Sequence, residues 1–353
     1  MDWYPLRLTT PSRPHVFGGT LITDWLVRVG LPPGRLAETW EVSDVEEDIA
    51  QVTNGPLAGR SLRELTLAHP DELVGPGWRG LHFPLLTKFI DASGMLPIHL
   101  HADDATAQRL ERQPNGKTEA WHILYAKPGA TALVGLKPGV DLNMLRPALW
   151  AEDYDSVMRR LPVRAGDTVY VPGGTLHSFG PGTLIYEIEQ TSNIQQHAMP
   201  WHMEDGSPVP ADERQANIEM LLQELRPEPR PDFHPGLRIA VADGVERTIC
   251  CAGPYFALER WGAAAGATIQ YPFGRATILS NVGAAVTLRA GSSVERLGRA
   301  ESRLLPAALG EVTIDGPADV LFGYVPDLER DIGSPLAAAG YGSGLITSLG
   351  ERV

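Results

Sequence analysis

Two short segments of the chain bring together the residue types that most often bind metal ions. Residues 98–101 read I-H-L-H, so His99 and His101 are separated by one residue. Because successive side chains of a β-strand point to opposite faces, both imidazoles would project from one face. Residues 166–177 read G-D-T-V-Y-V-P-G-G-T-L-H, in which a short strand and a Pro/Gly turn lead to His177. Two imidazoles from one strand and a third from another indicate a site for zinc or another first-row divalent metal.

These segments resemble the two sequence motifs of the cupin β-barrel superfamily, and the resemblance supplies a fourth ligand. The first cupin motif includes a glutamate downstream of its histidines. Glu119, in G-K-T-E-A-W, fills that position after a longer gap than most cupins show. We therefore expect one ion, with room left for water or a bidentate substrate, held by His99, His101, Glu119 and His177. The alternative is a degenerate cupin without metal, whose packed imidazoles and carboxylate would be costly unless hydrogen-bonded.

The elements that must position these side chains are short strands. The chain has 37 glycines and 30 prolines, so turns interrupt it often. Short apolar segments between turns predict strands at residues 82–90, 96–100, 119–126, 168–171, 183–189, 255–260 and 320–325. Helical spacing is sparse and predicts helices at residues 62–74 (cut by a proline), 103–112, 152–160 and 211–225. The pattern predicts an all-β barrel or sandwich with a few added helices. Together with the cupin resemblance, it implies a mainly β fold with two cupin-like β-barrel (jelly-roll) domains.

A proline-rich segment divides the chain. Residues 226–235 read R-P-E-P-R-P-D-F-H-P and separate the best predicted helix from a new β-rich region. We expect a metal-binding catalytic domain at residues 1–235 and a second cupin-like domain at 236–330. The second domain has neither an H-x-H pair nor a downstream histidine, so we expect it to lack metal and to wall one side of a cleft. Residues 331–353 are rich in Gly, Ala and Ser and are expected to form a loosely attached tail.

The composition excludes several classes of function. Hydrophobic residues make up 43% of the 353 residues, which is enough for a sizeable core. A formal net charge of −13 argues against a general basic surface for nucleic acid or anionic membrane, and leaves open a local basic pocket for a small anion. We expect no membrane span, since no run of about 20 apolar residues exists, and no secretory signal. The adjacent Cys250 and Cys251 cannot form a disulfide framework, and we expect both to be half-buried residues of a strand. We also expect a cytoplasmic location.

Over most of its length the chain resembles the type I phosphomannose isomerases (mannose-6-phosphate isomerases). The matching segments occur in order at residues 17–19, 37–43, 54–59, 84–91, 99–104, 116–121, 135–138, 172–177, 186–190 and 305–311. The resemblance implies a metal-dependent aldose–ketose isomerase that uses zinc to interconvert mannose 6-phosphate and fructose 6-phosphate through a cis-enediolate. A divalent ion would polarise the oxygens at C1 and C2 while a base moves a proton between those carbons.

The resemblance also implies roles for residues outside the metal site. Glu187 matches the family position proposed for acid–base work, and Lys88 and Lys117 match positions that line the pocket. We expect both lysines to bind substrate, and Lys117 also to steady an oxyanion during catalysis. The interpretation of either lysine as a solvated surface charge stays open.

Three departures from the family pattern bear on the substrate. His99 stands where the family usually has Gln, and Pro97 stands where it has a Ser that resembles a phosphate contact. His197 stands where the family has Arg, ten residues after the position of Glu187. Arginine is permanently charged, whereas histidine is mostly neutral near pH 7 and can act as a general acid or base. The exchange would remove a charge-assisted contact of about 1.5–3 kcal/mol, and we expect a catalytic role for His197.

These departures leave other functions open. They are an isomerase of another sugar or sugar phosphate, an oxidative metal cupin, and a non-catalytic sugar-binding protein. Zinc is the expected metal, with iron, manganese or nickel as alternatives for a shell of three histidines and one glutamate. The expected partner is a small sugar or sugar phosphate, without nucleic acid or membrane, and the chain is expected to be a monomer or a homodimer.

Overall fold

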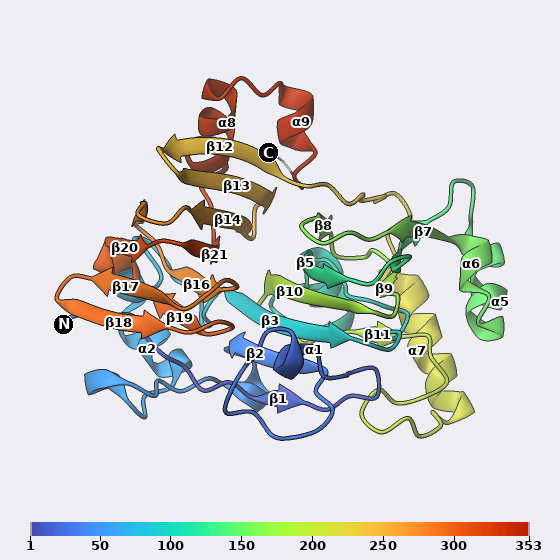
Figure 1. Ribbon diagram of the computed structural model, residues 1–353. Helices are drawn as coiled ribbons and strands as arrows, with labels where there is room; N and C mark the ends of the chain where they lie inside the picture. Colours follow the sequence, from blue (N-terminus) through green and yellow to red (C-terminus); the bar gives the residue numbers. More distant parts are fainter. Residues whose placement is uncertain (1, 352–353) are drawn as a thin grey trace.

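The computed structural model describes residues 2–351 and contains four antiparallel sheets arranged as two pairs (Figure 1). In the first pair, the six-stranded sheet has the order β1 (Ser12–Arg13), β2 (Glu38–Val42), β3 (Leu85–Ala92), β10 (Thr183–Gln190), β5 (Glu119–Ala126) and β8 (Thr168–Val171). Its partner sheet has the order β11 (Gln196–His197), β4 (His99–Leu100), β9 (His177–Phe179), β6 (Thr131–Leu136) and β7 (Met158–Pro162).

The second pair follows in the chain and repeats the first six-stranded sheet. Its six-stranded sheet has the order β12 (Leu237–Ala242), β13 (Val245–Ala252), β14 (Ala257–Ala263), β21 (Ala318–Tyr324), β16 (Thr277–Asn281) and β19 (Ser302–Leu305). The four-stranded sheet has the order β15 (Thr268–Pro272), β20 (Glu311–Asp315), β17 (Val286–Ala290) and β18 (Ser293–Leu297).

The helices are short and lie at the edges and outer faces of the sheets. The α-helices are α1 (Leu21–Asp24), α2 (Leu62–Ala68), α3 (Pro70–Leu73), α4 (Asp104–Thr106), α5 (Leu142–Ala151), α6 (Tyr154–Val157), α7 (Ala211–Glu224), α8 (Ser334–Ala338) and α9 (Ser343–Thr347). Other helical turns are η1 (Glu46–Asp48), η2 (Gly55–Leu57), η3 (Ala107–Glu111), η4 (Ala307–Leu309) and η5 (Leu328–Gly333). Among residues 2–351, no helix has the length and apolar composition needed to cross a bilayer.

Strand β10 is buried on both faces, and its alternate side chains point into two different cores. Leu184, Tyr186 and Ile188 belong to a core that also contains residues of the second six-stranded sheet. Ile185 belongs to the core between the sheets of the first pair. Because side chains alternate along a strand, Glu187 and Glu189 share the face of Ile185. The central strand therefore carries two carboxylates into the interior of the first pair of sheets.

The two six-stranded sheets pack against each other through that shared core. Tyr186 accepts a hydrogen bond of 3.0 Å from the Ser280 hydroxyl across the contact. The N-terminal segment crosses to the second pair, where Leu6 forms a β-bridge with Leu304. Burial of these apolar side chains fixes how one pair of sheets sits on the other.

The predicted mainly β, cupin-like class is confirmed, with one refinement. Among the described strands, no sheet closes into a hydrogen-bonded barrel; each pair forms an open sandwich. The strands of the first pair come from residues 12–197 and those of the second from residues 237–324. The domain division at residue 235 stays a prediction.

Several local predictions need correction. The helix expected at residues 152–160 ends at Val157, because Met158 and the two residues after it join β7 and pair with β6. Helix α5 was not predicted, because Pro147 lies inside it and disguises the helical pattern. The expected loose tail is helical instead, and Leu336 and Ile346 are buried against the second pair. Figure 1 shows α8 and α9 beside β12. Cys250 and Cys251 are fully buried rather than half-buried.

Candidate metal centre and adjoining cavity

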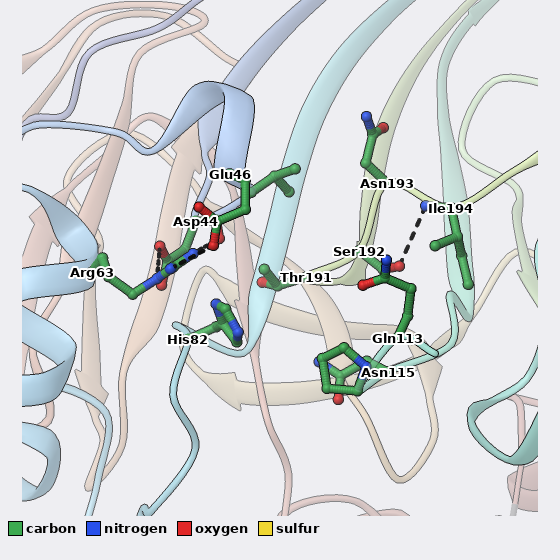
Figure 2. Close-up of a pocket in the computed structure, with 12 residues that line it drawn as sticks. Asp44, Glu46, Arg63, His82, Gln113, Asn115, Thr191, Ser192, Asn193 and Ile194 are labelled. Carbon is green, nitrogen blue, oxygen red and sulfur yellow. Dashed lines mark hydrogen bonds and ion pairs between the residues drawn. The ribbon is translucent and has the colours of Figure 1, made fainter. Parts of the chain in front are cut away.

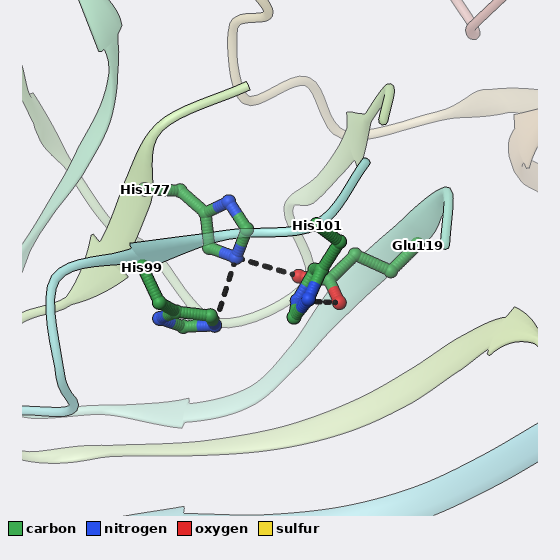
Figure 3. A group of neighbouring side chains, drawn as sticks. All are labelled: His99, His101, Glu119 and His177. Carbon is green, nitrogen blue, oxygen red and sulfur yellow. Dashed lines mark hydrogen bonds and ion pairs between the residues drawn. The ribbon is translucent and has the colours of Figure 1, made fainter. Parts of the chain in front are cut away.

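The four predicted metal ligands meet between the two sheets of the first pair (Figure 3). His99 on β4 and His177 on β9 are register partners in the five-stranded sheet. His101 follows β4, and Glu119 begins β5 in the facing six-stranded sheet. One ligand atom from each residue lies within 4.8 Å of the others, and all four side chains are buried. The cluster thus joins the two sheets at their interior.

Local sequence explains why the two imidazoles of I-H-L-H turn inward. Ile98 and Leu100 are buried on the outer face, in a core that includes residues of α5 and α7. The alternating positions His99 and His101 therefore face the interior. The Pro/Gly turn before His177 also holds this strand. Gly174 has φ +85°, which favours glycine, and its N–H donates to the His101 carbonyl at 2.6 Å.

Backbone carbonyls fix the tautomer of each imidazole. The Nδ1 atoms of His99, His101 and His177 lie 2.8, 2.7 and 2.7 Å from the carbonyl oxygens of Pro97, Ile194 and Thr175, respectively. A carbonyl oxygen only accepts, so each Nδ1 must carry the proton. In its neutral form, each ring then presents a bare Nε2 lone pair. Such carbonyl-oriented imidazoles are typical of metal ligands.

The bare nitrogens converge at distances that call for a cation. Nε2 of His177 lies 3.0 Å from Nε2 of His99 and 3.1 Å from a Glu119 oxygen. Nε2 of His101 lies 3.1 Å from the other Glu119 oxygen, which also faces the Lys117 ammonium at 3.2 Å. Lone pairs facing one another in a buried site repel unless a positive ion lies among them. The donor set of three imidazoles and one carboxylate fits a divalent metal.

The pKa values of the cluster favour the states that bind metal. Burial, and then the neighbouring imidazoles, hold the pKa of His99 well below its usual range. Burial and the Lys117 ammonium lower the pKa of His101 to about 3. Burial alone would raise the pKa of Glu119, but Lys117 and the imidazoles bring it well below its usual range. Neutral imidazoles beside an ionised carboxylate are the protonation states that a metal requires.

A chain of buried charges extends from the metal centre. The Lys117 ammonium lies 3.2 Å from Glu119 and 2.9 Å from Glu189. The Lys88 ammonium lies 3.0 Å from both Glu189 and Glu187. When all three carboxylates are ionised, the two ammonium groups leave one negative charge in excess. A divalent cation would reverse that excess and make the site suitable for an anionic ligand.

The carboxylates of this chain raise the pKa of both lysines. Although burial opposes it, Glu187 and Glu189 hold the pKa of Lys88 well above its usual range. Glu189 likewise raises the pKa of Lys117 against the effect of burial. Burial and repulsion from Glu189 raise the pKa of Glu187 well above its usual range. The structure therefore does not support solvated surface positions for either lysine.

A cavity of about 310 Å³ opens beside the cluster, and we call it the metal-side cavity. His99, Lys88, Lys117 and Glu187 line it from the interior. Arg13 and the ring of Trp40 line it as well. The Arg13 guanidinium lies 5.1 Å and the Lys88 ammonium 4.9 Å from the centre of that ring. The other lining residues are His15, Glu38, Asp48, Ile90, Leu96, Asn193, Gln195, Met203 and Glu204.

His197 lies next to the metal centre but is not among the lining residues described for this cavity. It is the register partner of His99, and the two rings stack with their centres 6.1 Å apart. Burial lowers the pKa of His197 to about 4. The imidazole is therefore neutral near pH 7 and does not replace the charge of an arginine.

A second polar cavity, of about 320 Å³, is lined in part by the loop at residues 191–194 (Figure 2). Arg63 is the only Arg or Lys among its described lining residues, and it is paired with Asp44 at 2.7 Å and Glu46 at 2.8 Å. Ile194 of the same loop supplies the carbonyl that orients His101. The metal-side cavity is the better candidate for an anionic ligand, because three cationic side chains line it, those of Arg13, Lys88 and Lys117, and it borders the predicted metal ligands.

Sequence reasoning missed two groups of this site. Glu189 is fully buried and forms ion pairs with both lysines. The sequence analysis assigned a role only to Glu187 of the same strand. The one-residue spacing of the two glutamates was the available signal, because it places both on one face. Arg13 lies in the N-terminal segment and forms an ion pair with Asp48. Nothing in its local sequence distinguishes it from a surface arginine.

The fold and the site together define a class: a mainly β, cupin-like protein with a buried His/Glu cluster able to bind a divalent metal. No protein-family model matches the chain. It is 29% identical over 326 residues to a probable mannose-6-phosphate isomerase, GmuF, of Bacillus subtilis, covering 91% of this chain and 99% of the relative. It is 27% identical to mannose-6-phosphate isomerase of Streptococcus mutans, covering 91% and 98%. The resemblance to the type I phosphomannose isomerases is confirmed, because these named relatives match along nine-tenths of the chain.

Solved structures agree with this assignment. The structure of mannose 6-phosphate isomerase from Bacillus subtilis superimposes with a TM-score of 0.82 at 25% identity, covering 92% of this chain and all of that one. A putative mannosephosphate isomerase from Archaeoglobus fulgidus gives a TM-score of 0.71 at 20% identity, covering 92% and 99%. At that identity the second likeness shows the fold alone.

Proposed function

We propose that this chain is a metal-dependent aldose–ketose isomerase that interconverts mannose 6-phosphate and fructose 6-phosphate. The observation that carries the proposal is the convergence of three bare imidazole nitrogens and one carboxylate beside a cavity lined by lysines. That arrangement combines an electrophile site, cationic groups and a carboxylate base within one cavity. The similarity to named mannose-6-phosphate isomerases supports the same substrate.

The residues that would hold the metal are His99, His101, Glu119 and His177. Zinc fits best, because imidazoles and carboxylates are its usual ligands and its coordination can expand to a fifth position for substrate. When bound, the ion supplies Lewis acidity at the oxygens on C1 and C2 of the sugar.

The cationic groups of the cavity suit the substrate's phosphate. Arg13 and Lys88 flank the Trp40 ring. The family arginine is replaced by His197, which is neutral near pH 7, so these two cations are the candidates for holding the phosphate. Arginine binds phosphate bidentately, and Arg13 keeps about a third of its side chain exposed, so it can reorient toward a ligand.

Proton transfer requires a group that reaches both C1 and C2. We assign Glu187, whose carboxylate lines the cavity 3.0 Å from Lys88. It would take the proton from C2 of the aldose and deliver it to C1, while the hydroxyl proton on O2 passes to O1, which gives the ketose. Lys117, paired with Glu119 and Glu189, would steady the negative charge on the sugar oxygen. His197, stacked on His99, would assist as a neutral acid–base group.

The test is conversion of mannose 6-phosphate by purified, zinc-loaded protein, coupled to detection of fructose 6-phosphate. Glu187→Gln keeps the shape and should lower kcat by about 10²–10⁴-fold, as loss of a general acid–base does. Glu213→Gln, at an exposed position on α7, is the matched control and should keep full activity. Absence of turnover in loaded wild-type protein, or full activity of Glu187→Gln, would refute the proposal.

The same preparation separates the remaining functions. A panel of other aldose phosphates and free sugars tests for a different substrate. Oxygen uptake with iron or manganese would indicate an oxidative cupin instead. The two free cysteines, both buried, support a reducing, cytoplasmic location as part of the proposal.

A further inference from the structure

A cavity of about 330 Å³ in the second pair of sheets has no role in the proposed reaction. We call it the C-terminal cavity. Its walls come from β13, β14, β15 and β21 and from η5. Its volume is close to the 310 Å³ of the metal-side cavity, so it can hold a ligand of the same size.

The two cavities occupy equivalent places in two sheets of identical topology. Within each six-stranded sheet, the strands in chain order take the first, second, third, fifth, sixth and fourth positions. The metal-side cavity is lined from the second, third and fourth positions, by Trp40, Lys88 and Glu187. The C-terminal cavity is lined from the same three positions by Arg247, Glu259 and Tyr324, respectively. The second sandwich therefore has a cavity at the place equivalent to the proposed reaction site of the first.

A fully satisfied polar network forms one wall of the C-terminal cavity. The buried Glu259 accepts bonds from Arg247 at 2.9 and 2.7 Å and from the Trp261 indole at 2.7 Å. It also accepts a hydrogen bond from the Tyr324 hydroxyl. A network with every partner in place is rigid. The cavity wall is thus preorganised for a ligand rather than collapsible.

The other walls are aromatic and cationic. Tyr271 and Phe273 lie in the lining with Trp261 and provide apolar ring faces. Arg275 and Arg330 join Arg247, so three guanidinium groups face two carboxylates, those of Glu259 and Asp331. The cavity therefore carries a net positive charge in a chain whose formal net charge is −13. Arginines with aromatic faces suit a ligand that has a phosphate and a carbon skeleton bearing C–H groups.

We propose that the C-terminal cavity binds a second molecule of a sugar phosphate, without catalysing its conversion. The equivalent topology, the matching volume, the rigid Glu259 network and the excess of arginines carry this inference. The ligand class follows from the cavity's own chemistry and goes beyond the proposed isomerase activity. Arg275 and Arg330 would bind the phosphate, and the aromatic residues would cover the carbon chain.

The experiment is isothermal titration calorimetry of the full chain with sorbitol 6-phosphate, which has no carbonyl group and cannot be isomerised. We expect two sites per chain in wild-type protein. Arg275→Ala/Arg330→Ala should abolish one site or weaken it by at least about tenfold, as loss of charge-assisted bonds to phosphate does. Arg330→Ala alone serves if the double variant fails to fold, because 64% of that side chain is exposed. Arg289→Ala, a half-exposed arginine on β17 outside the cavity, is the control.

Two outcomes overturn the inference: a single wild-type site at millimolar ligand that the arginine variants leave unchanged, or two unchanged sites in those variants. Inorganic phosphate that binds the C-terminal cavity as tightly as sorbitol 6-phosphate would refute the sugar phosphate class. Failure of the isomerase assay leaves this test intact, because it measures binding and not turnover. Conversely, an active isomerase with one such unchanged binding site refutes only the C-terminal site.

Discussion

A pair of carboxyl groups, one buried and one half-buried, predicts an unusual dependence of stability on pH. Glu224 of α7 and Glu111 of η3 are neighbours in the first pair of sheets. Each has an oxygen without a hydrogen-bond partner, and the amide of Gln196 reaches the other Glu224 oxygen only at 3.4 Å. Burial and repulsion from Glu111 raise the pKa of Glu224 to about 8. Burial raises the pKa of Glu111 as well.

The sign of the effect follows from the raised pKa values. The folded protein retains a proton that the unfolded chain releases near pH 4.5. The stabilisation is therefore complete below pH 4.5 and is lost as the pH rises toward 8. A shift from 4.5 to about 8 sets an upper bound of roughly 5 kcal/mol at about 1.4 kcal/mol per unit. Because Gln196 and water can relax toward ionised carboxylates, we expect about 1–3 kcal/mol.

Glu224→Gln removes the titration and keeps the shape of the side chain. Urea unfolding at pH 5, 6, 7 and 8 should show that the variant gains stability over wild type as the pH rises, by about 1–3 kcal/mol in total. Glu213→Gln, on the exposed face of the same helix, should follow the wild-type curve at every pH. Parallel curves for wild type and Glu224→Gln would show that the pair carries no raised pKa and would refute the reasoning.

Three further predictions concern the metal centre and its surroundings. Removal of metal by a chelator should lower the Tm measured by calorimetry, because bare imidazole nitrogens then face one another. In His177→Ala, chelation should cause no further loss of Tm. Glu189→Gln should lower kcat at least tenfold with little change in metal content, because both lysines lose a shared carboxylate. A kcat equal to that of wild type would contradict a positioning role for Glu189. Gly174→Ala should cost about 1 kcal/mol of unfolding free energy because φ is +85°, and unchanged urea stability would show that the turn relaxes.

The sequence could predict those parts of the site that follow from alternation and turn chemistry. His99 and His101 share a face because one residue separates them, and the Pro/Gly turn places His177 opposite His99. Glu119 lies on the other sheet, so its place beside the histidines depends on how two sheets pack, and only the family resemblance suggested it. Arg13 depends on the same packing and carries no local signal.

The fold prediction failed where tertiary contacts override local pattern. Residues 331–351 have a tail-like composition, yet Leu336 and Ile346 find an apolar surface on the second pair of sheets. Met158 continues a helical pattern in sequence but joins β7, because the edge of β6 offers it a hydrogen-bonded partner. Both outcomes depend on surfaces that distant segments build.

A repeated Glu-x-Trp pattern explains why one sandwich needs a cation and the other does not. In three strands the indole Nε1 donates to the glutamate two residues earlier, at 2.7 Å for Trp40, 2.8 Å for Trp121 and 2.7 Å for Trp261. The second Glu119 oxygen faces the Lys117 ammonium at 3.2 Å and the His101 imidazole nitrogen at 3.1 Å. Both oxygens of Glu259 are hydrogen-bonded, because the Arg247 guanidinium donates to each of them. The guanidinium supplies inside the second sandwich the positive charge that a metal ion would supply inside the first.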